Sequence, residues 1–223
     1  MATLLLRLQG PIQSWGTTSR FDERDTQLEP SKSGVLGLVC AALGRDRAEP
    51  IDDLAMLRMG VRVECDGVPL RDYQTATGVL IASSGRPDLG RTVISPRYYL
   101  ADAVFLVGLE GDRDLLARAH QALARPVWPL ALGRKSCVPS MPVYLPDALL
   151  EQSLPAALAG WPCLVTGQAP TAPRRVLLEH SSEGSVRLDQ PVAPFAERRF
   201  GPRFVKSELF FTGAVHVPDP TAA

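Results

Sequence analysis

The stretch Leu6-Arg7-Leu8-Gln9-Gly10-Pro11-Ile12-Gln13-Ser14-Trp15-Gly16 predicts how the chain begins to fold. Its apolar start predicts a strand over 2–8, which must end at Gly-Pro because proline has no N–H group and fixes φ. Gln13, Ser14 and Trp15 follow, so an indole lies beside amide and hydroxyl groups at a strand end. Such a group is suited to holding an unstacked RNA base. The alternative, which these residues alone favour, is that Trp15 fills the core with a hydrogen-bonded indole.

The composition describes a neutral chain that can bury a large core. Its 223 residues are 45% hydrophobic, enough for one elaborated domain or a domain with a smaller lobe. The 24 basic residues balance the 24 acidic ones. This excludes nucleic-acid binding through bulk charge, so any such site must be a local basic patch.

The cysteines indicate a reducing compartment and no metal site. Cys40, Cys65, Cys137 and Cys163 are widely spaced, without a Cys-x-x-Cys pair or a nearby histidine that would complete a zinc site. We therefore expect free thiols and no cofactor. The N-terminus reads as a strand rather than a signal peptide, and no apolar run has the length of a membrane span. These features lead us to expect a cytoplasmic protein.

The order of the predicted elements is typical of a ferredoxin-like fold of the α+β class. Ser33 is a good N-cap for a helix that Gly44 ends, and Asp66-Gly67 is a hairpin turn signal. The elements alternate as strand, helix, strand, strand, helix, strand, the plan that RNA-recognition domains share. They are expected at 2–8, 33–44, 60–65, 103–109, 112–124 and about 141–145.

Three further segments complete the predicted organisation. Residues 17–30 are polar and without periodicity, which predicts a loop or an extended excursion, and 67–100 is an insertion. The predicted domain therefore spans 1–145. Residues 146–223 are expected to form a β-rich extension packed on it, with a possible short helix at 147–159 and strands at 174–179 and 208–217.

Several clusters combine cations with aromatic or glycine residues. Lys32 and Ser33 open the first helix, where free N–H groups can cradle a phosphate; equally, the glycines there can allow tight packing. Arg71 and Tyr73 alternate onto one strand face. The other candidates are Arg97 with Tyr98, Gly133 with Arg134 and Lys135, and Arg198 with Arg199.

Alternation also separates Tyr98 from Tyr99, so one tyrosine is expected to stack on a base and the other to pack. The alternatives for the remaining clusters are a solvated turn at 133–135, and a protein interface or solvated face at 198–199.

Taken together, these segments resemble the CasD subunits of type I-E CRISPR Cascade complexes, in the RAMP superfamily. The ordered set covers most of the chain, but 138–195 offers little to match. The matching pieces are Leu6–Gly16, Pro30–Leu38, Arg71–Thr75, Arg97–Ala103, Leu132–Cys137 and, more weakly, Phe195–Arg199.

The resemblance implies a non-catalytic RNA-binding subunit for antiviral defence. Such a subunit grips the repeat-derived 5′ handle of the CRISPR RNA, caps the backbone of CasC subunits and helps to seat the large PAM-reading subunit CasA. Target DNA is reached through the assembled complex. The resemblance further implies a protruding hairpin, called the thumb, for which we favour the insertion at 67–100 over the excursion at 17–30. It also implies that Gly133 belongs to a glycine-rich loop.

Two other functions stay open at this stage. The first is a metal-independent endoribonuclease specific for repeat RNA, which needs a base such as histidine to activate the 2′-OH. His120, His180 and His216 lie outside the matching motifs, and packed or solvated side chains are expected for each. The second is a small-molecule enzyme with a pocket near Trp15 and Tyr98.

Overall fold

A seven-stranded antiparallel sheet forms the body of the protein in the computed structural model, which describes residues 1–17, 23–81, 85–165 and 173–211. Its strand order is β7-β1-β6-β3-β8-β10-β9. The strands are β1 (Ala2–Gln9), β3 (Arg58–Cys65), β6 (Val104–Gly111), β7 (Leu149–Leu150), β8 (Pro173–His180), β9 (Ser185–Pro191) and β10 (Phe200–Phe211).

Both faces of this sheet carry apolar side chains, which explains why β1 and β6 are almost continuously apolar. Leu4, Leu6 and Leu8 join the larger core with α1 (Lys32–Leu43) and α3 (Arg113–Ala124). Leu5 faces the other way, into a core with α4 (Leu154–Gly160). A short helix, α2 (Asp52–Ala55), precedes β3. Within the described ranges, no helix combines the length and apolarity needed to cross a membrane.

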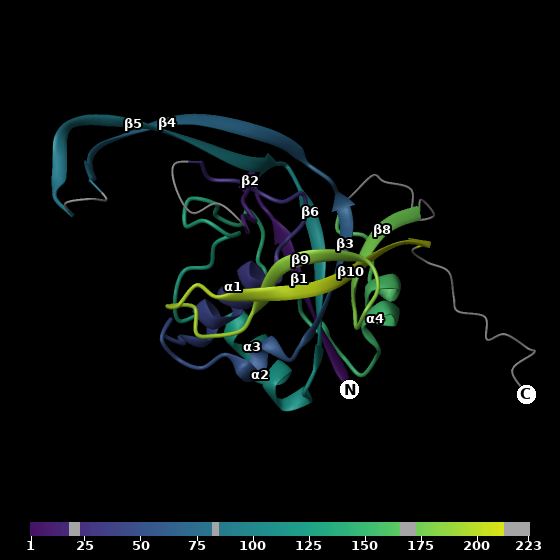
Figure 1. Ribbon diagram of the computed structural model, residues 1–223. Coiled ribbons are helices and arrows are strands. Elements are labelled where there is room, and N and C mark those ends of the chain that lie inside the picture. Colours follow the sequence, from purple (N-terminus) through teal and green to yellow (C-terminus); the bar gives the residue numbers. More distant parts are fainter. Residues whose placement is uncertain (18–22, 82–84, 166–172, 212–223) are drawn as a thin grey trace, which may run out of the picture.

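The second sheet is a long hairpin that arches away from the body (Figure 1). It pairs β4 (Val68–Leu80) with β5 (Pro87–Ala101), and the short β2 (Ile12–Gln13) pairs with the end of β5. The hairpin lies within the predicted insertion at 67–100, extended by one residue. Asp66 and Gly67 form its entry; Gly67 has φ +73, as the turn signal predicts.

The structure corrects several predicted boundaries. Ser31, not Ser33, caps α1, because its Oγ accepts a hydrogen bond from Gly34 N. No strand forms at 141–145, since Pro142 and Pro146 lack the N–H groups that a ladder needs, and only Leu149–Leu150 pairs with β1.

In the C-terminal part, the helix within 147–159 is confined to α4 and ends one residue later. The strand predicted at 174–179 is confirmed as β8. The strand predicted at 208–217 begins earlier, at Phe200; its residues 212–217 lie outside the described part.

Burial makes the Cys40 thiol a poor nucleophile. Burial raises the pKa of Cys40 to about 11, and burial likewise raises the pKa of Cys137. Because the thiolate is the reactive form, we expect iodoacetamide at pH 8 to modify the half-buried Cys65 and Cys163 first, and Cys40 and Cys137 only after denaturation. Mass spectrometry of the alkylated chain checks this. Modification of native Cys40 as fast as Cys65 would contradict it.

Candidate nucleic-acid interface

One face of the β4–β5 hairpin presents an exposed tyrosine, a half-buried tyrosine and an exposed arginine. The register pairs Arg71 with Tyr98 and Tyr73 with Pro96, so Arg71, Tyr73 and Tyr98 share a face, as alternation predicted for the first two. The Arg71 guanidinium carbon lies 6.0 Å from the centroid of the Tyr98 ring. Tyr73 is 63% exposed. Aromatic rings beside a guanidinium in this arrangement can stack on unpaired bases.

The two adjacent tyrosines have different environments, as expected. Tyr99 is 4% exposed and packs in the core, whereas Tyr98 stays partly exposed. A hydrogen bond with the Glu23 carboxylate raises the pKa of Tyr98, so its hydroxyl stays protonated at neutral pH. Tyr98 is therefore the tyrosine of this pair that is available for stacking.

The loop after Leu132 is anchored against the base of the hairpin. Gly133 has φ +91, and a Cβ there would lie 1.7 Å from the Ser14 carbonyl oxygen. The Arg134 guanidinium donates hydrogen bonds to the carbonyls of Arg24 (2.8 Å) and Asp25 (3.1 Å) and lies 4.9 Å from the centroid of the Tyr99 ring. Lys135 is exposed. The loop thus brings the cations Arg134 and Lys135 to the hairpin base. Gly133 itself is needed because only a residue without a side chain fits against the Ser14 carbonyl.

Gln13, Ser14 and Trp15 are buried, so the chain uses them as a brace rather than as an exposed base-binding group. The Trp15 indole donates a hydrogen bond to Gln13 Oε1 at 3.1 Å, and the Gln13 amide donates to the Ala103 carbonyl at 2.7 Å. Trp15 is 1% exposed, which bears out the reading of a core-filling indole.

Ser14 joins two of the segments that form the interface. Its Oγ donates to the Tyr98 carbonyl at 3.2 Å and its N–H to the Leu132 carbonyl at 3.1 Å. The backbone of Trp15 continues the brace, because its N–H donates to Thr26 Oγ1 and its carbonyl accepts from Gln27 N. The three buried residues therefore hold the hairpin, the 132–137 loop and the 23–27 segment together.

Lys32 cannot serve as the exposed phosphate contact that its position at the start of α1 suggested. It is 1% exposed, and its Nζ lies 3.0 Å from both Glu179 carboxylate oxygens. Burial lowers the pKa of Lys32, while Glu179 opposes this shift. The Lys32 N–H donates to Asp189 at 2.8 Å, so a protein carboxylate already occupies the helix N-terminus. Ser33 is half-buried beside it.

Arg198 and Arg199 lie apart from this region. They are exposed in the loop before β10, where Ala196 N donates to the Arg47 carbonyl in the loop after α1. Arg199 forms an ion pair with Glu197 at 3.1 Å. The structure therefore does not bring these two arginines to the hairpin base.

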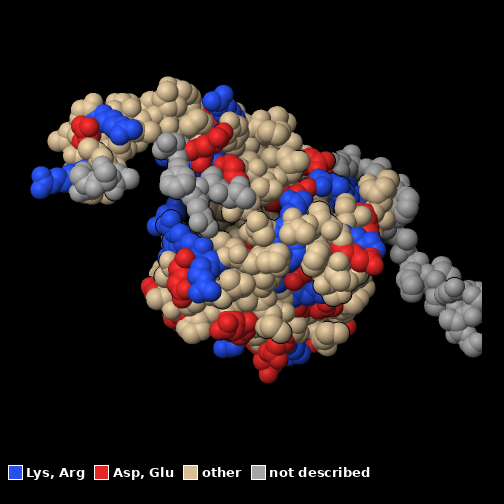
Figure 2. Space-filling model, in the orientation of Figure 1, with Lys and Arg blue, Asp and Glu red and all other residues tan. Residues whose placement is uncertain are grey.

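Two guanidinium donors at the hairpin base are unpartnered. Arg97 Nε and Arg134 Nη1 are buried and have no hydrogen-bond acceptor among the described residues. Figure 2 shows Lys and Arg side chains on the hairpin and on the body below it, interspersed with acidic ones. The basic character of the interface is local, as the balanced composition requires.

The two histidines that the structure describes have structural partners. His120 stacks on Tyr144 with 4.7 Å between ring centroids, and its Nε2 lies 2.9 Å from the Leu145 carbonyl. His180 Nδ1 accepts hydrogen bonds from Ser182 N and Glu183 N. His216 lies outside the described residues.

The sequence did not indicate that the 23–29 segment helps to form the base of the hairpin. Arg24 pairs its backbone with β5, through Arg24 N to the Pro96 carbonyl and Tyr98 N to the Arg24 carbonyl. Glu29 and Asp66 both accept hydrogen bonds from Arg175 on β8, which ties this segment and the hairpin entry to the sheet. The polar, aperiodic composition of 17–30 was the only signal, and it did not indicate these partners.

Comparison with known proteins gives concordant matches. A family model described as CRISPR-associated protein (Cas_Cas5) matches residues 3–206. The CRISPR system Cascade subunit CasD of Escherichia coli (strain K12) is 33% identical over 157 residues, covering 64% of this chain and 69% of that protein.

Two solved structures are also similar over nearly the whole chain. One, described as a crystal structure of a Cas protein, is 52% identical with a TM-score of 0.78, covering 94% of this chain and 95% of the other. The other belongs to a CRISPR RNA-guided surveillance complex. It is 32% identical with a TM-score of 0.75, and the match covers 99% of this chain and 95% of that one.

Proposed function

This chain belongs to the Cas5 family of CRISPR-associated proteins, and from that premise we propose that it is an RNA-binding subunit of a CRISPR Cascade surveillance complex serving antiviral defence. It grips the repeat-derived 5′ handle of the crRNA and caps one end of the backbone. The likeness to CasD and to a chain of an RNA-guided surveillance complex supports this role.

The observation that carries the RNA-binding proposal is the meeting of the hairpin base with the 132–137 loop. There, exposed Tyr73 and half-buried Tyr98 lie on the hairpin, with the exposed cations Arg71 and Lys135 beside them. Aromatic faces for bases and accessible cations for phosphates are the two components of single-strand recognition. Arg97 and Arg134 add half-buried positive charge behind this surface, each with one unpartnered donor among the described residues.

The strand order supports the proposed architecture. We propose a ferredoxin-like domain of the RAMP type at 1–145, supported by the neighbouring order β7-β1-β6-β3, in which β7 lies just beyond that boundary. The β4–β5 hairpin is the proposed thumb. Strands β8, β9 and β10 extend the same sheet and represent the β-rich extension of 146–223.

The proposed partners are those of a type I-E complex in the cytoplasm. The thumb meets the neighbouring backbone subunit CasC, and a further surface seats the large PAM-reading subunit CasA. Target DNA is contacted through the assembled complex. Gln13, Ser14 and Trp15 support the RNA surface from inside, through their hydrogen bonds to the hairpin base and its neighbouring segments. Lys32 is buried against Glu179 and Asp189 and is left out of the proposed contacts.

A non-catalytic role is the proposal, and repeat-specific cleavage is its alternative. Support comes from His120 and His180, whose ring nitrogens engage carbonyl or backbone N–H partners away from the hairpin base. Incubating the purified chain with repeat RNA in EDTA separates the two functions. Cleavage at one position, lost with tyrosine or lysine substitutions at the interface, would replace the proposal by the ribonuclease.

The proposed function is tested by a tagged pull-down from cells that express this chain, its candidate backbone partners and a CRISPR array. We expect guide RNAs that share one 5′ handle, and we expect them to be absent without this chain. Recovery of neither RNA nor partner subunits would overturn the proposal. Sequencing the RNA ends identifies the handle.

Substituting Lys135 by alanine is expected to weaken RNA binding and to lower the slope of log affinity against log salt by about 1, since each phosphate contact releases counterions. Affinity measured at several salt concentrations checks this. Lys206→Ala is the control, because Lys206 lies on β10 and pairs with Glu183 in the turn before β9, away from the hairpin. An unchanged slope in Lys135→Ala would show that Lys135 contacts no phosphate.

A further inference from the structure

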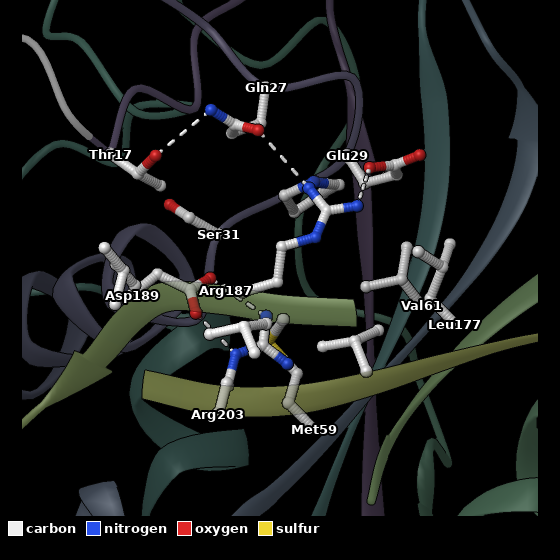
Figure 3. Close-up of a pocket in the computed structure, with 14 residues that line it drawn as sticks. Thr17, Gln27, Glu29, Ser31, Met59, Val61, Leu177, Arg187, Asp189 and Arg203 are labelled. Atoms are coloured by element: carbon white, nitrogen blue, oxygen red, sulfur yellow. Dashed lines mark hydrogen bonds and ion pairs between the residues drawn. The ribbon is translucent and has the colours of Figure 1, made fainter. Parts of the chain in front are cut away.

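The charged side chains around one cavity on the sheet are paired with one another. This cavity, of about 200 Å³, lies between strands β3, β8, β9 and β10 and the segment that leads into α1 (Figure 3). Arg187 donates hydrogen bonds to Glu29 Oε2 at 3.0 Å and to Gln27 Oε1 at 3.3 Å. Arg203 donates to both oxygens of Asp189, at 2.6 and 2.9 Å. These charges are satisfied within the protein, so they do not indicate a ligand.

A second cavity, a groove of about 510 Å³, lies where the C-terminal ends of α1 and α3 meet the 125–128 segment. Small and apolar side chains line most of it, namely those of Ala42, Leu43, Ala122, Ala124 and Val127. The backbone fixes its shape, because Val127 N donates to the Ala42 carbonyl at 3.0 Å and Trp128 N to the Ala41 carbonyl at 3.1 Å. Val127 is 63% exposed and Trp128 is 42% exposed, so apolar surface remains uncovered here.

Two arginines without acidic partners lie at the rim of the groove. Arg118 and Arg125 are exposed, and among the described residues neither guanidinium forms a hydrogen bond or an ion pair. The Asp53 carboxylate, which Arg118 attracts electrostatically, forms its ion pair with Arg45 instead. None of the eight lining residues, all of which lie in the described ranges, is acidic. The groove therefore carries local positive charge on a chain that is neutral overall.

The spacing of the two arginines suits a helix laid along the groove. Positions 118 and 125 are seven residues apart, which is two helical turns or about 10.5 Å. A partner helix with acidic residues at i and i+7 has the same spacing, so both carboxylates can pair with the guanidinium groups. Aliphatic residues at i+3 and i+4 of that helix would face the apolar floor between the two arginines.

The groove lies at the far end of α1 from the hairpin. The helix α1 begins beside the brace, where a Cβ at Gly34 would lie 2.9 Å from the Trp15 ring. Its 12 residues extend over about 18 Å. Figure 1 shows α3 on the opposite side of the body from the β4–β5 hairpin. A partner in the groove would therefore leave the hairpin face open.

We propose that this groove docks an acidic amphipathic helix of a partner protein. The carboxylates of that helix bind Arg118 and Arg125, and its aliphatic residues cover Leu43 and Val127. An apolar lining offers no contacts for successive phosphates or bases, so the observations favour a protein over an RNA. This inference goes beyond the proposed function, since docking in the groove does not depend on RNA binding.

The probe is a fluorescein-labelled peptide of about 18 residues, long enough to form a helix, with the pattern Glu-x-x-Leu-Leu-x-x-Glu on a background of alanine and glutamine. We expect wild type to bind it, and we expect Arg118→Ala and Arg125→Ala each to weaken binding by about 2- to 5-fold, the effect of an exposed ion pair. Arg113→Ala is the matched control, because Arg113 is exposed on the same helix and does not line the groove. Fluorescence anisotropy measures the affinities, and equal urea midpoints establish that the variants fold.

A steric block and a charge swap test the two features of the groove separately. Ala124 is exposed and lines the groove, whereas Ala156 is exposed on α4, which packs on the other face of the sheet. We expect Ala124→Trp to abolish peptide binding and Ala156→Trp to retain it. A second peptide, with lysines in place of both glutamates, should bind the double variant Arg118→Glu/Arg125→Glu but not wild type.

Three results would overturn the docking groove. They are the absence of peptide binding to wild type, equal affinity of wild type and Ala124→Trp, and weaker binding of repeat RNA to the groove variants, which would assign the groove to RNA. The pull-down of guide RNA keeps this inference separate from the proposed function. If wild type recovers guide RNAs but binds no peptide, only the groove fails. If it binds the peptide through the groove but recovers no guide RNA, only the proposed function fails.

Discussion

Substituting Gly133 by alanine is expected to destabilise the chain by about 3 kcal/mol or more and to abolish RNA binding at the hairpin base. The residue adopts φ +91, and the new Cβ would lie 1.7 Å from the Ser14 carbonyl oxygen. No side-chain rotation relieves a clash between a Cβ and backbone, so the 132–137 loop must move away from Ser14. Arg134 and Lys135 would move with it.

Urea denaturation of the full chain and RNA affinity are the two measurements. Gly160→Ala is the control, because a Cβ at Gly160 would meet no atom within 4 Å. An unfolding midpoint for Gly133→Ala equal to that of Gly160→Ala would contradict the close approach to Ser14.

Substituting Glu64 by alanine is expected to cost about 3–5 kcal/mol of stability, the usual effect of removing one partner from a buried ion pair. Both side chains of the Arg62–Glu64 pair are fully buried, with 2.5 Å between Arg62 Nη2 and Glu64 Oε1. Arg174 lies 3.3 Å from the same carboxylate. Burial lowers the pKa of Arg62, which Glu64 counteracts. Without Glu64, two buried guanidinium groups lose their counter-charge.

The free energy of unfolding in urea measures this effect. Glu64→Gln keeps the side-chain volume, and we expect it to lower the free energy of unfolding nearly as much as Glu64→Ala. The reason is that both variants remove the negative charge, whereas only alanine also removes packing. Glu151→Ala is the matched control, since its ion pair with Arg113 is 62% exposed on both sides and is expected to leave the midpoint nearly unchanged. Near-wild-type stability of Glu64→Ala would mean that the arginines find water or other acceptors.

Local patterns predicted most of the elements. The apolar run of β1 and its stop at Gly10-Pro11 are confirmed, as are the amphipathic α3 and the turn at Asp66-Gly67 that opens the hairpin. These features depend on periodicity and on proline and glycine geometry, which neighbouring residues alone determine. The fourth strand was misplaced, because prolines in 139–146 prevent pairing over a segment that otherwise runs along β1.

The candidate site was predicted only in part. Arg71, Tyr73 and Tyr98 lie together on the exposed hairpin face, since strand alternation is a local property. Burial, however, depends on what packs on a residue. Lys32 reads as an exposed cation at a helix start, yet Glu179 and Asp189, which are far away in sequence, enclose it.

The sequence by itself determined the family, the strand–helix order and the exposed aromatic face of the hairpin, because these follow from short motifs and local backbone geometry. Only the tertiary structure decided that Gln13, Ser14 and Trp15 form a buried brace. The cavity between Gln27, Glu29 and Arg187 was likewise decided by the tertiary structure. Gln27 and Arg187 are 160 positions apart, and the pairing of β9 with β10 beside β8 brings them within hydrogen-bond distance.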